Sequence, residues 1–154
     1  MLLSGGDYSS KKYNFMTISW GFMGTMWFKP VIMVGLRPQR HTLKFIENFD
    51  TFTLTAFTAE YKEALAFCGA HSGRDCDKVA ECGLTPIAAE KVDAPAFKEA
   101  ELVIECKKLY HDQLKMKNFH DKSILSKCYP NRDLHIMFTG EVVNISGVGK
   151  YKSA

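Results

Sequence analysis

The sequence has no apolar run that approaches the roughly 20 residues needed to cross a bilayer. Its first residues, MLLSGGDYSS, contain only two leucines before they turn polar, which does not fit the apolar centre of a secretory signal peptide. We therefore expect a soluble, cytoplasmic protein with no membrane partner.

The sequence also lacks a cysteine pattern with a known chemistry. Its five cysteines form no CxxC pair and no spacing typical of zinc ligands: Cys68, Cys76, Cys82, Cys106 and Cys128. An odd number of cysteines with no disulfide-framework spacing, in a sequence that shows no secretory signal, indicates reduced thiols. We expect neither a disulfide framework nor a bound metal.

The sequence has little excess of either charge sign: 20 basic and 17 acidic residues leave a net charge of +3. Such a small and scattered excess does not indicate a nucleic-acid partner. The histidines share no spacing typical of a nucleophile or a metal site, so we interpret them as surface or half-buried polar residues: His41, His71, His111, His120 and His135. We nominate no catalytic side chain.

Apolar periodicity predicts short strands separated by short helices within one domain, residues 1–154. We expect strands over 14–20, 31–36, 52–57, 101–114 and 134–146. The helices expected are 43–49, 59–68 and 76–82, with Thr42 and Thr58 as N-caps. We expect a loop over 21–30, extended chain over 83–97 and an irregular excursion over 115–133.

This order of elements has no regular alternation of strands and helices. It favours a mostly antiparallel β barrel with helices packed outside. A doubly wound parallel sheet would need longer crossover helices.

Two arginines follow a buried strand in the segment LRPQRHT, residues 36–42. Arg37 and Arg40 stand where the strand ends, and Thr42 stands where a helix is expected to begin. Free backbone N–H groups at a helix start attract anions, and arginine donates two parallel hydrogen bonds to phosphate. The segment is either an anion site or a solvated turn with two surface arginines.

A second segment, CGAHSGRDCDK at residues 68–78, combines a tight Ser-Gly loop with basic residues at another helix start. One such loop is usually structural. Two loops that each pair a helix start with basic residues favour a shared anion site.

Five segments together resemble the flavin reductase-like family, nearest its flavoredoxin branch. They are NFMTISWG, LRPQRHTLKFI, FTLTAF, CGAHSGRDCDKVAECGLTP and HIMFTGEVV, and they occur in family order from about residue 14 to residue 145. The resemblance implies the FMN-binding split-barrel fold, an FMN cofactor and a homodimer. Family members usually have more residues before the strand that begins at Asn14, so this chain either starts inside a first barrel strand or is truncated.

The resemblance also implies positions for the cofactor. The isoalloxazine and ribityl side would lie against Asn14, Thr17, Ser19 and Trp20. The phosphate would meet Arg37, Arg40 and Thr42 from one loop and Ser72, Gly73 and Lys78 from the other. Trp20 would pack beside the flavin or fill the barrel core, and the apolar residues 22–28 would lie near the flavin or a second subunit.

The function implied is that of an FMN-binding oxidoreductase. Reducing equivalents would pass from NAD(P)H or a redox protein, through the flavin, to an acceptor. A non-enzymatic FMN-binding electron carrier on the same fold is the alternative, and the sequence does not separate the two. A basic nucleic-acid binder is less favoured, because the aromatic residues follow core periodicity and form no exposed stacking platform.

Overall fold

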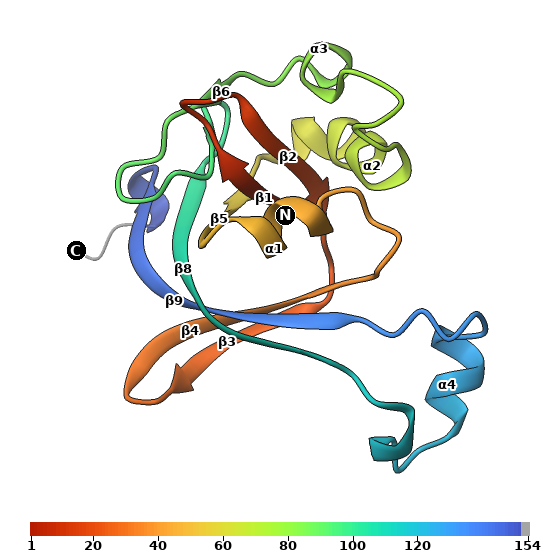
Figure 1. Ribbon diagram of the computed structural model, residues 1–154. Helices are drawn as coiled ribbons and strands as arrows, with labels where there is room; N and C mark the ends of the chain where they lie inside the picture. Colours follow the sequence, from red (N-terminus) through yellow and green to blue (C-terminus); the bar gives the residue numbers. More distant parts are fainter. Residues whose placement is uncertain (152–154) are drawn as a thin grey trace.

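One antiparallel sheet of seven strands dominates the computed structural model, which describes residues 1–151 (Figure 1). Its strand order is β2-β1-β5-β8-β9-β4-β3, and β6 pairs with β7 in a separate small sheet. The strands are β1 (Leu2–Asp7), β2 (Lys12–Thr17), β3 (Gly21–Met26), β4 (Lys29–Leu36), β5 (Thr51–Ala56), β6 (Pro86–Ile87), β7 (Ala96–Phe97), β8 (Leu102–Gln113) and β9 (Ile136–Gly147).

The helices are short and lie between the strands. They are α1 (Leu43–Asn48), α2 (Lys62–Ala70), α3 (Lys78–Cys82) and α4 (Ser123–Cys128), with 3-10 turns η1 (Ala59–Tyr61), η2 (Met116–Asn118) and η3 (Gly149–Tyr151). Within residues 1–151, no helix has the length and apolar character required to cross a bilayer.

The main core lies inside the curved sheet and is closed by α1. Strand alternation supplies it: in β5, Phe52 and Leu54 join the core, whereas Thr53 and Thr55 do not. The buried members are Leu3, Met16, Ile32, Val34, Leu36, Leu43, Ile46, Phe52, Leu54, Ile104, Cys106 and Phe138. The expected mostly β architecture is confirmed.

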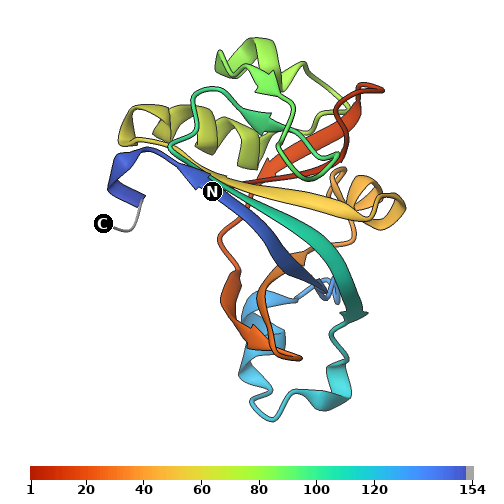
Figure 2. The same cartoon turned by 90° about the vertical axis from the view of Figure 1, so that its left-hand side faces the viewer.

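A second core buries the other face of β1 and β2 beneath α2 and α3 (Figure 2). In β1, Leu3 belongs to the main core and its neighbour Leu2 to the second. In β2, Met16 and Phe15 divide in the same way. Burial on both faces fixes β2 between the barrel interior and α2, and this places the polar ends of β2 beside the loops that precede α1 and α3.

Three features of the first 36 residues differ from the sequence prediction. Residues 2–7, to which no complete strand was assigned, form β1 and pair with both β2 and β5. The strand expected over 14–20 ends at Thr17. The loop expected over 21–30 is a hairpin, in which β3 pairs with β4 around Trp27 and Phe28, both with positive φ (53° and 59°).

The helix termini also differ in part. Neither Thr42 nor Thr58 makes a side-chain capping bond. The N-cap of α3 is Asp77, whose carboxylate accepts from the amides of Val79 and Ala80, because a carboxylate at the N-cap can reach two free N–H groups. Gly83 ends α3 in the left-handed conformation, as expected.

The excursion between β8 and β9 contains η2 and α4, so it is more ordered than expected. Both views place α4 at the end of the molecule opposite α2 and α3 (Figures 1 and 2). In the segment 83–97, which was expected to be extended, only the two-residue strands β6 and β7 are regular, and residues 90–94 form bends.

Gly140 of β9 allows a close approach of its neighbours in the main core. A Cβ atom at this position would lie 2.5 Å from two ring carbons of Phe52 and 3.0 Å from Cβ of Cys106. Any side chain here would therefore displace the Phe52 ring from the main core. Gly24 on β3 is the opposite case, since a Cβ there meets no atom within 4 Å.

We expect Gly140→Ala to lower the free energy of unfolding by about 1–3 kcal/mol, the usual cost of overpacking a core. Gly24→Ala is the matched control and should be neutral or slightly stabilising, because alanine costs less backbone entropy than glycine. Urea unfolding measures both. Equal midpoints for the two variants would contradict the packing of Phe52 against Gly140.

Candidate functional site

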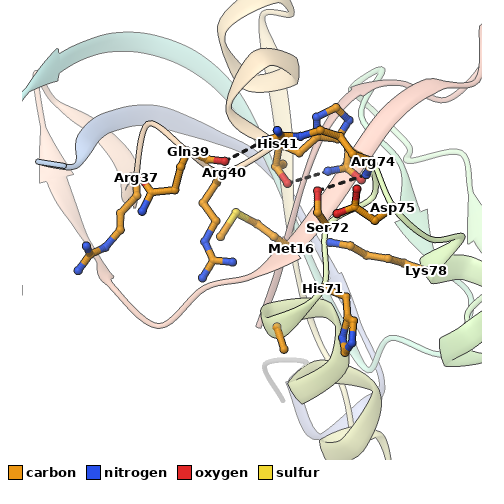
Figure 3. Close-up of a pocket in the computed structure, with 13 residues that line it drawn as sticks. Met16, Arg37, Gln39, Arg40, His41, His71, Ser72, Arg74, Asp75 and Lys78 are labelled. Atoms are coloured by element: carbon orange, nitrogen blue, oxygen red, sulfur yellow. Dashed lines mark hydrogen bonds between the residues drawn. The ribbon is translucent and has the colours of Figure 1, made fainter. Parts of the chain in front are cut away.

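Two adjoining hollows bring together the side chains singled out in the sequence. The larger, called here the cationic pocket, has a volume of about 660 Å³ and is lined by Asn14, Met16, Arg37, Gln39, Arg40, His41, Thr42, Ala70, His71, Ser72, Arg74, Asp75 and Lys78 (Figure 3). The smaller, the Trp20 pocket, has about 160 Å³ and is lined by Met16, Thr17, Ile18, Ser19, Trp20, Gly35, Arg37, Arg40 and His135. Because Met16, Arg37 and Arg40 line both, the hollows form one continuous site.

Two arginines join the loop before α1 to the segment that carries the Ser-Gly loop. Arg40 donates to the carbonyl of Gly69 at 2.8 Å, and Arg74 donates to the carbonyl of Gln39 at 2.9 Å. The amide of Arg74 also donates to the hydroxyl of Ser72 at 3.2 Å. The structure therefore brings together the two basic segments that the sequence suggested would share one site.

The cationic pocket is strongly positive. Three arginines and one lysine line it, and Asp75 is its one carboxylate. Burial, followed by the nearby charges of Lys44, Arg74 and Lys78, lowers the pKa of His41. The charge of the pocket therefore comes from its arginines and lysine, and the pocket suits an anionic group.

Lys78 is a buried cation at the base of this pocket, with only 4% of its surface exposed. Its ammonium group donates to the carbonyl of Phe15 at 2.9 Å and to that of Cys68 at 3.2 Å. Burial lowers its pKa. An ammonium group has three donors, so the two carbonyls leave one N–H for a ligand.

Arg37 is already paired within the chain. Its guanidinium group donates to the carboxylate of Asp133 and, at 2.7 Å, to the carbonyl of Cys128. Hydrogen bonds from Gln39 and Arg37 lower the pKa of Asp133 and keep it charged. Arg37 thus anchors the excursion to the site, and its positive charge is shared with this carboxylate.

Thr42 and Gly73 position Asn14, whose side chain links the two loops to β2. The amide of Asn14 donates to the hydroxyl of Thr42 at 2.9 Å. A Cβ atom on Gly73 would lie 2.3 Å from Oδ1 of Asn14, so only glycine allows this contact. Thr42 has αR backbone angles and does not cap α1, so its capping role is wrong. Since its oxygen accepts from Asn14, its hydroxyl proton remains available to a ligand.

The Trp20 pocket offers a flat apolar wall beside polar groups. Trp20 is 46% exposed, so the interpretation that it fills the barrel core is wrong. Its ring packs on that of His135, with centroids 4.7 Å apart. Thr17 donates its hydroxyl to the carbonyl of Leu65, and its oxygen can still accept.

His135 is buried, whereas the sequence placed it with the other histidines among surface or half-buried polar residues. It forms a hydrogen bond of 2.8 Å between its Nδ1 and the hydroxyl of Tyr129. Burial and then the charge of Arg37 lower its pKa, so the ring is neutral at neutral pH. His135 is the first residue of the motif HIMFTGEVV, and this position could have indicated a place near the site. It was overlooked because the five histidines were interpreted as one group.

The cationic pocket suits an anionic group such as a phosphate, and the Trp20 pocket suits the edge of a flat ring. A phosphate would find the free N–H of Lys78 and the hydroxyl of Thr42 among arginines, and a flat ring would find Trp20. Within residues 1–151, no three His, Cys, Asp or Glu side chains gather as metal ligands would.

Comparisons with known proteins identify the family and the fold of the chain. The family model for the flavin reductase like domain matches residues 2–153. The flavoredoxin of Desulfovibrio vulgaris (Miyazaki F) is 27% identical, with a TM-score of 0.74 over 97% of this chain and 69% of that one. A protein of Shewanella frigidimarina, assigned as a flavin reductase with a split barrel domain, is 20% identical, with a TM-score of 0.76 over 99% of this chain and 68% of that one.

An FMN-binding protein from Thermus thermophilus also shares the fold, at 20% identity and a TM-score of 0.70, over 95% of this chain and 68% of that one. No curated protein matches the chain in sequence. The mostly antiparallel split barrel expected from the resemblance is confirmed. With its family model matched along almost the whole length, the chain belongs to the flavin reductase-like family of flavoproteins.

Proposed function

We propose that this protein binds FMN, with the phosphate in the cationic pocket and the flavin ring toward the Trp20 pocket. The observation that supports this most strongly is the buried ammonium group of Lys78, which has two carbonyl partners and one donor left in a pocket lined by arginines. The similar proteins described as flavoredoxin and as FMN-binding give independent support.

The phosphate end would use groups from both basic segments. Lys78 and Arg40 supply charge, Thr42 supplies a hydroxyl donor, and Ser72 and Gly73 shape the loop that closes over them. Arg37 would contribute at the junction of the two pockets while remaining anchored to Asp133.

The ring end would use β2 and the segment after it. Asn14 joins the two loops to β2, Thr17 and Ser19 line the strand side, and Trp20 gives a flat surface. Its packing on His135 orients the Trp20 ring without any ligand.

Bound FMN supplies the redox chemistry itself, accepting reducing equivalents and passing them on. The chain's own groups would hold the phosphate, orient the ring and limit water on one face. No side chain is required as a general base, so we assign none as catalytic. We propose that the donor is NAD(P)H or a redox protein and that the setting is the cytoplasm, where the thiols stay reduced.

A non-enzymatic electron carrier is the second candidate, favoured by the similarity to a flavoredoxin. It would bind FMN in the same site but would not turn over with a nicotinamide.

Turnover separates the enzyme from the carrier. With FMN present, we expect the purified protein to oxidise NADH or NADPH catalytically, with electrons passing to excess flavin. The decrease in nicotinamide absorbance at 340 nm measures the rate. A protein that binds FMN but gives no rate above free flavin with either nicotinamide would be the carrier.

We also propose a homodimer formed through the β3–β4 hairpin. Strand β3 is a sheet edge, and all six of its residues are exposed. Phe22, Met23 and Trp27 are more than half exposed, and Phe28 is fully exposed. An apolar edge of this kind normally marks an interface, and a second copy pairing about a twofold axis would cover both hairpins at once.

The hairpin gives a direct test of the dimer. Sedimentation at micromolar concentration should give twice the monomer mass of 17.4 kDa. Phe28→Lys should shift the protein to monomer, because it places a charge in the proposed interface. Ile87→Lys, a similar change on the distant strand β6, should leave the dimer intact. A wild-type mass of 17.4 kDa would contradict the proposal.

The phosphate assignment predicts selectivity between two flavins. Lys78→Met keeps the length of the side chain and removes its charge, and it should weaken FMN binding by one to two powers of ten, since a hydrogen bond to a charged group contributes about 1.5–3 kcal/mol. Thr42→Val should cost less. Riboflavin has no phosphate, so its affinity for each variant should equal its weak affinity for the wild-type protein.

Flavin fluorescence titration measures these affinities. Lys62→Met, which removes an exposed lysine on α2, is the control and should leave both flavins unaffected. Equal affinity of the wild type for FMN and riboflavin would show that the cationic pocket does not hold the phosphate.

A further inference from the structure

Two thiols face each other between α2 and α3, outside both pockets. The sulfur atoms of Cys68 and Cys82 are 3.4 Å apart. Cys68 is completely buried in the second core, and Cys82 is half-buried at the C-terminal end of α3. The proposed flavin chemistry uses neither of them.

The other three cysteines have different surroundings. Cys76 donates toward the carbonyl of Ser72, Cys106 is buried in the main core, and Cys128 ends α4. Metal binding is not the explanation for the pair, since in the described part of the chain no third ligand joins it. Only Cys68 and Cys82 have a thiol neighbour in contact.

We propose that Cys68 and Cys82 form a reversible disulfide that ties α2 to α3 and closes the loop on one side of the cationic pocket. A disulfide has a sulfur–sulfur distance of about 2.0 Å, so the two atoms must approach by more than 1 Å. Cys82 has the freedom to do this, because it lies at the end of a five-residue helix that stops at Gly83.

The two thiols would react in a fixed order with a peroxide. Burial raises the pKa of Cys68 to about 12, so this group stays a thiol. Cys82 is only half-buried, so we propose that its sulfur is the one that attacks the peroxide O–O bond, which yields a sulfenic acid and water. The sulfur of Cys68 then attacks that of Cys82, and a second water leaves with the Cys68 proton.

In the net reaction, two thiols and one hydrogen peroxide give one disulfide and two waters. A small dithiol restores the reduced pair by exchange.

The disulfide would close a ring of chain from residue 68 to residue 82, and this ring contains the Ser-Gly loop beside the pocket. Between the two cysteines lie Ser72, Gly73 and Arg74, all on the walls of the hollows around Asn14. The backbone carbonyl of Cys68 accepts from Lys78, so the residue at one end of the disulfide is linked through its backbone to the base of the cationic pocket. Oxidation therefore restrains the loop and stabilises the fold, since a cross-link reduces the freedom of the unfolded chain.

Tryptic mapping tests the link directly, with no flavin present. After treatment with hydrogen peroxide, alkylation and digestion, we expect peptide 63–74, which contains Cys68, joined to peptide 79–91, which contains Cys82. Dithiothreitol should release both. Cys76 lies in a separate peptide, 75–78, and should be recovered alkylated. Recovery of Cys68 and Cys82 as alkylated thiols, or a link that involves Cys76, would overturn the proposal.

Thermal unfolding tests the consequence. Peroxide should raise the Tm of the wild type and of the matched control Cys76→Ser, and dithiothreitol should reverse the rise. Cys82→Ser should show no rise. An equal rise in Cys82→Ser, or a linked wild type with unchanged Tm, would show that the pair does not restrain this loop. Because neither measurement needs FMN, failure here is distinct from failure of the proposed flavin site.

Discussion

The buried ammonium group of Lys78 is the constraint around which the site is organised. A charge removed from water is costly unless it is compensated, and here two backbone carbonyls provide only part of the compensation. One carbonyl belongs to Phe15 on β2 and the other to Cys68 on α2, so the lysine joins strand, helix and α3 at one point. An anion in the cationic pocket would supply the missing counter-charge, so the phosphate proposed to bind there would stabilise the buried lysine.

The split barrel makes this burial possible. Strand β2 is covered on one face by the barrel interior and on the other by α2 and α3. The side chain of Lys78, which comes from the outer helical layer, can therefore reach a backbone carbonyl of β2. Arg40 and Arg74 then hold the two loops together by bonds to backbone carbonyls, and these bonds do not require the ligand to be present.

The sequence predicted the parts of the fold that rest on strong periodicity. Residues 31–36 and 52–57 were assigned correctly within one or two residues, because continuous or alternating apolar residues have few other interpretations. The hairpin over residues 21–36 was missed. Its turn contains Trp27 and Phe28, where the usual residues with positive φ are glycine and asparagine, and the apolar residues of its first strand, β3, are exposed.

The placement of the two basic segments predicted that they would meet at one pocket, and the structure shows this, but their detailed contacts were not predicted. The sequence brought Arg40 and Lys78 to one region, but no spacing could show that Arg37 pairs with Asp133, almost a hundred residues away. The sequence predicted Thr42 as a helix N-cap, but in the folded chain its hydroxyl accepts a hydrogen bond from the side chain of Asn14. Long-range polar pairs of this kind depend on how the chain returns on itself, which local patterns do not encode.

The visible absorption spectrum of the purified protein is the measurement that decides whether this chain binds FMN, as we propose. The purified protein should be incubated with FMN, passed through a desalting column to remove the free flavin and then scanned. We expect a yellow protein with flavin absorption bands and close to one FMN per chain. A colourless protein after this treatment, with its fold intact by circular dichroism, would contradict the proposal.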